Sequence, residues 1–306
     1  MALPLAALLV FYRPGRREAV AAAALIAFVA WGALTPADDF ARFERAWVFL
    51  LAGGLVVALA WRPPAVAGFV GTGLTTVAIA AVAGGTLMAV TRFTYGELQW
   101  LATRHYGEQV RILVGALANA AAVPAAADST AAGPAMVDAL EQSAGVMVQL
   151  VGEVLPALVL VQSLAAIAVA WAIYQAVAKE PEQAQLPTMR EFRFNDHLIW
   201  GVVGALLALV VVPGLSAAGI VGARVESAAR GIGENLAVFF GSLYLMRGLG
   251  VAAAIAVAAG FKGPAAVIFG FFLSLFLMPV VVAGCLALGV ADTWVDWRKR
   301  LNREKR

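Results

Sequence analysis

The sequence has few of the residue types on which catalytic and metal-binding sites depend. One cysteine, Cys285, and two histidines, His105 and His197, occur among 306 residues. A single cysteine excludes an internal disulfide, and its apolar neighbours indicate a packing residue rather than a nucleophile. The histidines belong to no HExxH pattern and to no Cys/His cluster. We therefore expect no enzyme, no catalytic residue, no metal site and no cofactor.

Charge is also scarce. Only 13% of the residues are charged and 62% are hydrophobic, whereas about a quarter of an ordinary soluble domain is charged. The net charge is +3, and the 22 Lys and Arg residues are spread between hydrophobic runs and at the C-terminus. Without one basic face, the chain is a poor candidate for nucleic-acid binding. The apolar runs are long enough to cross the ~30 Å hydrocarbon layer of a bilayer.

These runs predict an all-α protein, a polytopic transmembrane helical bundle that forms a single membrane domain over residues 1–306. We expect about seven or eight spans, because a span takes about 20 residues. Trp47 and Trp61 are expected at the membrane interfaces, and Pro156 should kink its helix. The full spans are expected at residues 18–34, 47–61, 65–90, 146–177, 197–212, 235–259 and 264–290.

Two segments do not fit a span. Residues 92–144 mix charged residues with leucines and valines, which predicts an extramembrane or interfacial insertion. Residues 292–306 form a basic tail, which the positive-inside rule places in the cytoplasm. Seven alternating spans then put the basic segments 13–17 and 179–193 outside, against the same rule. One element must be miscounted, and the candidates are residues 110–127, residues 214–230 and a hairpin within 264–290.

Arg247 is the first candidate for a functional residue. It lies twelve residues into the expected span 235–259, near the bilayer midplane, where a charge costs about 2.5 kcal/mol or more. Such an arginine binds an anionic ligand, forms a structural ion pair or reaches the interface. Glu153 is its expected partner, because Gln142, Gln149 and Glu153 share one face of a neighbouring span. That face forms either a polar lining or a hydrogen-bonded seam between helices.

Polar residues also mark the start of the penultimate span. Glu234 and Asn235 open it, with Arg230 one turn earlier. These residues either stabilise the helix start through an Arg230–Glu234 pair or contact a ligand through Asn235. The threonines of the expected span 65–90 should bond to carbonyls of their own helix. They are Thr72, Thr75, Thr76 and Thr86.

Several segments of the second half resemble a known family. They are Pro156 in an apolar helix, FRFNDHLIW at residues 192–200, Glu234–Leu236 before Tyr244, Arg247 and Gly248, and residues 288–300, LGVADTWVDWRKR. With these residues the chain resembles the YybS-like family of predicted bacterial membrane proteins, a domain of unknown function, DUF2232. The resemblance covers the whole chain and is strongest over residues 150–300.

The resemblance implies a fold and a place rather than an activity. The family is distantly similar to the substrate-binding membrane subunits of energy-coupling-factor vitamin transporters, which implies a solute-capturing bundle in the bacterial cytoplasmic membrane. Family members usually have a further helix before the segment that Met1–Tyr12 resembles, which implies either a wrongly assigned start codon or a truncated chain and leaves open whether the native start lies upstream of Met1. Arg247 departs from the family, which often has glutamine at that position.

We therefore expect a solute-binding or permease subunit of a transporter, with a pocket near Arg247, Glu153 and Asn235. Gln149 and Tyr244 are further candidate ligand-binding residues. The expected partners are the lipid bilayer and an unknown small-molecule solute; because the chain has no Walker motif, other chains would supply an ATPase or coupling subunit. The alternative is a non-transporting scaffold or assembly factor. A polar cavity open to one face would favour the transporter, and a filled bundle the scaffold.

Overall fold

The computed structural model describes residues 1–12, 15–61, 64–121, 132–177, 186–261, 270, 272, 275–295 and 297. Within these residues the secondary structure is helical and contains no strand, which confirms the all-α bundle. The helices are α1 (Ala2–Phe11), α2 (Arg16–Leu34), α3 (Asp39–Trp61), α4 (Pro64–Thr91), α5 (Tyr95–Ala121), α6 (Ala132–Glu153), α7 (Leu155–Val177), α8 (Ile199–Leu206), α9 (Val212–Ala217), α10 (Ala223–Ala258) and α12 (Met278–Val295).

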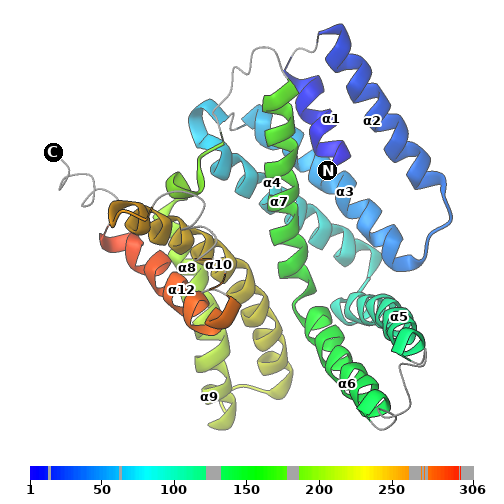
Figure 1. Cartoon of the computed structure of the whole chain (residues 1–306), viewed down its shortest axis with the longest axis vertical. Helices are drawn as coiled ribbons and strands as arrows, with labels where there is room; N and C mark the ends of the chain where they lie inside the picture. The colour runs from blue at the N-terminus through cyan, green and yellow to red at the C-terminus, as the bar shows by residue number, and fades with distance from the viewer. Residues whose placement is uncertain are drawn as a thin grey trace.

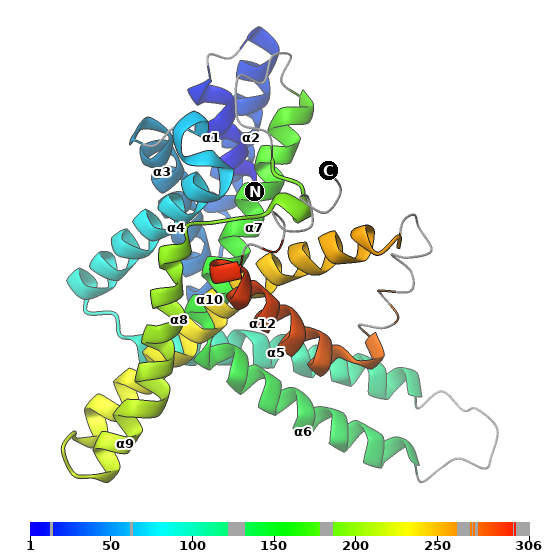
Figure 2. The same cartoon turned by 90° about the vertical axis from the view of Figure 1, so that its left-hand side faces the viewer.

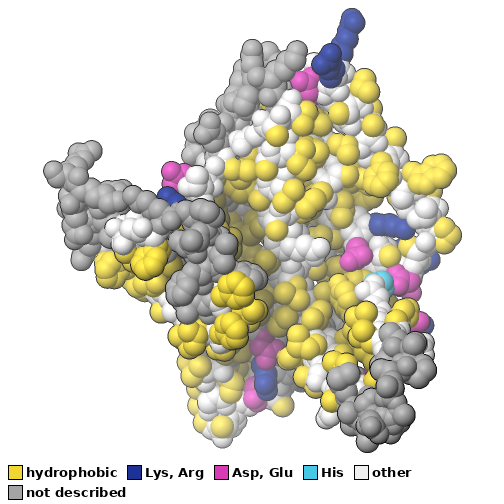
Figure 3. All heavy atoms as spheres, in the orientation of Figure 1, with side chains coloured by type: hydrophobic (Ala, Val, Ile, Leu, Met, Phe, Trp, Pro, Cys, Tyr) yellow, Lys and Arg dark blue, Asp and Glu magenta, His cyan; other side chains and the backbone are white. Residues whose placement is uncertain are grey.

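Seven described segments are long and apolar enough to cross a membrane. They are α2, α3, Gly68–Thr91 of α4, α7, Asp196–Ala217 through α8 and α9, α10 and α12. Hydrophobic side chains cover a broad area of the face shown in Figure 3, between charged side chains at the top and others in the lower half. Such a surface suits a protein surrounded by lipid. The chain is therefore a multi-pass membrane protein.

The helices form two groups (Figure 1). In the first, α1 to α4 and α7 pack around a buried core that includes Leu55, Ile167 and Trp171. Between α3 and α7, the indole Nε1 of Trp47 donates a hydrogen bond of 2.9 Å to Ser163 Oγ. The polar atom of Trp47 is thus satisfied between two helices, and its expected place at a membrane interface stays a prediction. The second group contains α8, α9, α10 and α12, and α10 packs against α7.

The expected span 146–177 is two helices. α6 ends at Glu153, α7 begins at Leu155, and Val154 lies in the turn between them. Pro156 lies in the first turn of α7, where its missing N–H costs no helical bond. The proline ring also clashes with the carbonyl four residues earlier, that of Gly152, so the expected kink at Pro156 takes the form of a break at Val154.

α5 and α6 form a hairpin that extends away from the first group (Figure 2). A reciprocal cap starts α5, because the Thr94 backbone N–H donates to Glu97 Oε2 at 2.6 Å and the Glu97 N–H donates to Thr94 Oγ1 at 3.3 Å. Gly152 of α6 lies against Thr103 of α5. The expected insertion 92–144 is thus a helical hairpin that continues to Glu153.

The ends of the helices lie on two faces. In Figure 1, α2 begins and α3 and α7 end at the upper face, whereas α3 and α7 begin at the lower face, near the hairpin. Of the suspected segments, residues 214–230 hold the turn from α9 to α10, so they add no span. Residues 110–127 belong to α5 as far as Ala121, and much of 264–290 precedes α12. Residues 122–127, most of residues 264–274 and residues 298–306 of the tail lie outside the described residues, whereas residues 278–290 belong to α12.

Candidate functional site

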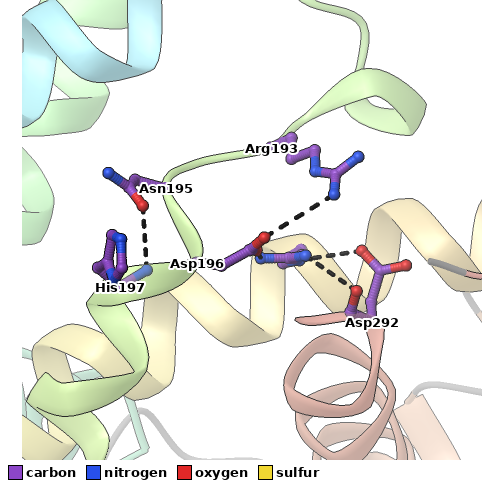
Figure 4. Close-up of polar contacts among 6 residues, drawn as sticks. Arg193, Asn195, Asp196, His197 and Asp292 are labelled. Atoms are coloured by element: carbon purple, nitrogen blue, oxygen red, sulfur yellow. Dashed lines mark hydrogen bonds and ion pairs between the residues drawn. The ribbon is translucent and has the colours of Figure 1, made fainter. Parts of the chain in front are cut away.

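Arg247 is fully buried in the second helix group, with a relative exposure of 0%. Its Nε donates to Asp292 Oδ2 at 2.9 Å, and its Nη2 donates to the backbone carbonyl of Asp292 at 3.1 Å. Its Nη1 donates to Asp196 Oδ1 at 2.7 Å. The guanidinium also lies 5.4 Å from the centroid of the Phe194 ring. Figure 4 shows the two carboxylates on either side of this unlabelled arginine.

The partners of Arg247 come from the ends of other elements. Asp292 lies in the last turn of α12, and Asp196 begins a short 3₁₀ turn before α8. Asn195 fixes that turn, because its Oδ1 accepts the His197 N–H at 3.0 Å. Arg193 lies 3.9 Å from Asp196. Two arginines and two aspartates thus form a cluster without net charge, which reduces the cost of burying ions.

Two glycines bring α12 close to Arg247. A Cβ on Gly248 of α10 would overlap the backbone carbonyl of Cys285, and a Cβ on Gly289 of α12 would overlap the carbonyl of Tyr244. Only glycine permits this approach of two helix backbones, which is a common contact between membrane helices. The contact places Asp292, one turn after Gly289, beside the guanidinium.

The expectation that Glu153 pairs with Arg247 is wrong. Glu153 ends α6, and its Oε1 accepts a 3.3 Å hydrogen bond from Gln149 of its own helix. The break at Val154 removes Glu153 from the span in which the sequence placed it. Gln149 and Glu153 do share a helix face, but they bond along α6 and form no seam between helices.

Asn235 joins the two helix groups at this break. Its Oδ1 accepts the Ala157 N–H at 2.9 Å, and its Nδ2 donates to the carbonyls of Glu153 at 3.0 Å and Gly231 at 2.9 Å. The hydroxyl of Tyr95 also donates to the Glu153 carbonyl. Asn235 therefore satisfies a free N–H of α7 and a free carbonyl of α6 at once.

Several local expectations are confirmed. Arg230 Nε lies 3.0 Å from Glu234 Oε1, as expected for residues four apart on a helix. The four threonines of α4 donate to carbonyls four residues earlier, at distances of 2.8 to 3.0 Å.

The five predicted ligand-binding residues thus fall into two places. Arg247 and Tyr244 lie inside the second group, where the Tyr244 ring packs edge-on against Phe194 at 5.1 Å. Asn235, Glu153 and Gln149 lie at the helix break, and twelve helical residues between Asn235 and Arg247 span about 18 Å. In both places the polar groups mostly satisfy one another.

Among the described residues, an open pocket lies elsewhere, beneath the α5–α6 hairpin. A pocket of about 520 Å³ is lined by the first turns of α3, by residues 155–162 of α7 and by both hairpin helices. Phe40, Val148 and Leu155 are among its many apolar walls, and Glu44 and Gln162 contribute polar side chains. A second apolar pocket, of about 300 Å³, lies beside Trp47 and Met88. Neither pocket is lined by any of the five predicted residues.

A charged hollow of about 450 Å³ lies beside the first pocket, with Phe40 in the wall of both. Asp38 Oδ1 accepts the Ala41 N–H at 2.7 Å and Asp38 Oδ2 lies 2.8 Å from His105 Nδ1. These two hydrogen bonds hold the pKa of the Asp38 carboxyl below its usual range. Within the described part of the chain, no three His, Cys, Asp or Glu side chains are arranged to hold a metal ion.

The comparison with known families agrees with this membrane fold. A family model described as "Predicted membrane protein (DUF2232)" matches residues 1–293. The chain belongs to this family. No curated protein and no solved structure matches the chain. Membership in DUF2232 confirms the family resemblance, while the similarity to energy-coupling-factor subunits stays a prediction.

Only partial signals in the sequence pointed to the residues that form the Arg247 cluster and the pocket of this DUF2232 protein. Asp196 and Asp292 lie in segments that carry the family resemblance, but nothing in their spacing paired them with Arg247. Carboxylates at the ends of apolar runs were the available signal, because a buried arginine needs such partners. Glu44 lies in a charged link between runs and gave no sign of a pocket.

Proposed function

We propose that this DUF2232 protein is a membrane-embedded subunit that binds a small solute, as the solute-binding or permease subunit of a transporter does. The pocket of about 520 Å³ beneath the α5–α6 hairpin is the observation that supports this function. Small-molecule sites typically measure about 300–1,000 Å³ and combine apolar walls with a few polar groups. The pocket has this size and this composition.

The proposed site therefore lies beneath the hairpin rather than around Arg247. Two aspartates and the Phe194 ring already occupy the surroundings of that guanidinium. A solute there would have to displace ion pairs within a buried cluster, at a cost of several kcal/mol. The pocket beneath the hairpin needs no such exchange. If transport uses ATP, an ATPase or coupling subunit from another chain drives it.

We also propose an orientation in the bacterial cytoplasmic membrane. The basic residues Arg16 and Arg17 begin α2 at the upper face of Figure 1, where α3 and α7 end. The end of α12, which precedes the basic tail, lies beside the start of α8, because Asp292 and Asp196 share Arg247. We assign both to the upper face, at which α7 ends. The positive-inside rule then makes this face cytoplasmic and places the hairpin outside.

The orientation is tested with a cysteine introduced at Ala139, an exposed residue of α6. A maleimide that does not cross membranes should label Ala139→Cys in intact cells, and a fluorescent protein fused after Arg306 should be bright. Labelling of Ala139→Cys only after the cells are opened would reverse the orientation.

The binding function is tested by filling the pocket. Ala144 lines it from α6, so Ala144→Phe should occupy the space that a solute needs. Native mass spectrometry of the parent should detect a bound small molecule that Ala144→Phe loses. Ala139→Phe, an exposed change on the same helix, should keep it. Equal occupancy of the parent and both variants would reject this pocket as the site.

A second function, as a scaffold or assembly factor, has one observation in its favour. The far part of the hairpin exposes large apolar side chains, among them Ile112 and Leu113 of α5 and Val146 of α6. Such a surface fits a partner protein as well as lipid. Changing Ile112 and Leu113 to Ser would then remove a co-purifying protein and leave the small molecule of the pocket bound.

A further inference from the structure

The pocket beneath the hairpin has a carboxylate at its edge. Glu44 lines it from α3, one turn after Phe40, and is exposed. Across the part of the chain that the structure describes, no Lys, Arg or His lies within ion-pair distance of Glu44. The edge of an otherwise apolar pocket therefore carries one negative charge.

The arginines nearest to Glu44 in sequence are engaged elsewhere. Arg42 Nη1 lies 2.9 Å from Asp39 Oδ1. Arg45 Nη1 donates to the carbonyl of Thr35 at 2.8 Å, and its Nη2 donates to Thr35 Oγ1 at 2.9 Å. Arg42 thus pairs within the first turn of α3, Arg45 holds the link between α2 and α3, and neither pairs with Glu44.

Two further polar groups share this pocket. The amide of Gln162 comes from α7 and the hydroxyl of Tyr106 from α5. Burial, and then the nearby Glu44 carboxylate, raise the pKa of the Tyr106 hydroxyl, which therefore keeps its proton at neutral pH. The polar groups of the pocket are thus one carboxylate, one amide and one hydroxyl, all able to accept hydrogen bonds from a cation.

We propose that the pocket binds an amphiphile with an ammonium head and an apolar body. The ammonium group lies beside Glu44, where Gln162 and Tyr106 supply further oxygen atoms, and the apolar body packs against Leu155 and Val159 of α7. An anionic head would meet the Glu44 charge without a compensating cation. This inference rests on the proposed function, because it names the chemical class of the solute.

The head group is tested with three probes that share one alkyl chain: octylammonium, octan-1-ol and octanoate. Each is titrated into the purified full-length protein in a neutral detergent, and the thermal midpoint gives its apparent affinity. Octylammonium should stabilise the protein most and octanoate least. Glu44→Gln should weaken octylammonium about fivefold, as loss of one exposed ion pair implies, and leave octan-1-ol unchanged. Glu141→Gln, an exposed change on α6 outside the pocket, should behave as the parent does.

The outcomes distinguish a failure of the ammonium-head inference from a failure of the proposed solute-binding function. Equal stabilisation by octylammonium and octan-1-ol, or no effect of Glu44→Gln, would overturn the ammonium head and leave a pocket for a neutral solute. If the probes act alike on the parent, Ala144→Phe and Ala139→Phe, the pocket itself is not the site, and the proposed function fails with the inference.

An ammonium head occurs both on free amines and on ethanolamine phospholipids, so a second arm distinguishes the two sources. The delipidated protein is exposed to vesicles of phosphatidylethanolamine or of phosphatidylglycerol and then analysed by native mass spectrometry. Retention of phosphatidylethanolamine by the parent but not by Glu44→Gln identifies a lipid. Retention of neither lipid, with the octylammonium response intact, identifies a free amine. Preferential retention of phosphatidylglycerol would contradict the inference.

Discussion

The Arg247 cluster and the pocket beneath the hairpin place charge among apolar residues in opposite ways. Arg247 is buried, and two aspartates, a carbonyl and an aromatic ring surround it. Glu44 is exposed beside open space and meets no cation among the described residues. A charge in a membrane protein therefore indicates a ligand site only where its partners leave it incomplete and where space remains. Arg247 meets neither condition.

Replacing Arg247 should disrupt the buried cluster and give the largest loss of stability. Arg247→Gln leaves the carboxylate of Asp292 buried without its guanidinium, so we expect a loss of about 3–5 kcal/mol of stability. The measurement is the thermal midpoint of the detergent-solubilised protein. Arg230→Gln breaks an exposed pair and should cost less than about 1 kcal/mol. If Arg247→Gln is as stable as the parent, the cluster does not hold the helices together.

A smaller loss should follow from separating α10 and α12. Gly248→Ala places a methyl group on the carbonyl of Cys285, and such overpacking costs about 1–3 kcal/mol. Gly241→Ala is the matched control on the same helix, because no atom lies within 4 Å of the new Cβ. The thermal midpoint of Gly248→Ala should therefore be lower than that of Gly241→Ala. Equal midpoints would mean that the helices move apart without cost.

Asn235 tests whether the helix break depends on the second group. Asn235→Leu leaves the Ala157 N–H and the Glu153 carbonyl without this partner, which should cost about 1–3 kcal/mol. Hydrogen exchange should become faster in the first turn of α7. Gln149→Leu, at an exposed position of α6, should leave that exchange unchanged. Unaltered exchange in Asn235→Leu would show that the helix break at Val154 does not depend on Asn235.

The smallest effect concerns pH at the charged hollow beside the pocket. The lowered pKa of Asp38 means that its carboxylate stabilises the folded protein above the ordinary aspartate range, about pH 4. This contribution is lost as the pH falls through the lowered folded-state pKa. The thermal midpoint of Asp38→Asn should therefore depend less on pH in the acidic range than that of the parent. Asp39→Asn should retain the parent's dependence, and an unchanged profile for Asp38→Asn would contradict the role of Asp38.

Much of the fold could be predicted because it depends on local chemistry. Apolar runs located the spans, and contacts between residues four apart, such as Arg230–Glu234 and Thr76–Thr72, require only a helix. A kink was expected at Pro156, but the division into two helices at Val154 was not. The apolar run continues through it, and its cause lies partly in Asn235, 78 residues from Ala157 in sequence.

The candidate site was harder to predict for the same reason. Arg247 was correctly singled out, but its partners lie 51 and 45 residues away and depend on how α8 and α12 pack against α10. The pocket is a property of four helices together, and Glu44 acquires its setting only when the hairpin covers α3 and α7. No pattern within one helix carries that information.

The reactivity of Cys285 provides a way to measure local opening at the close contact of α10 and α12. It is the only thiol of the chain, it is 6% exposed, and its carbonyl touches the space above Gly248. A thiol reagent should react with it only during openings that expose this part of α12. The rate of Cys285 modification in the unmodified protein therefore reports how often α12 opens near its contact with α10, without an engineered label.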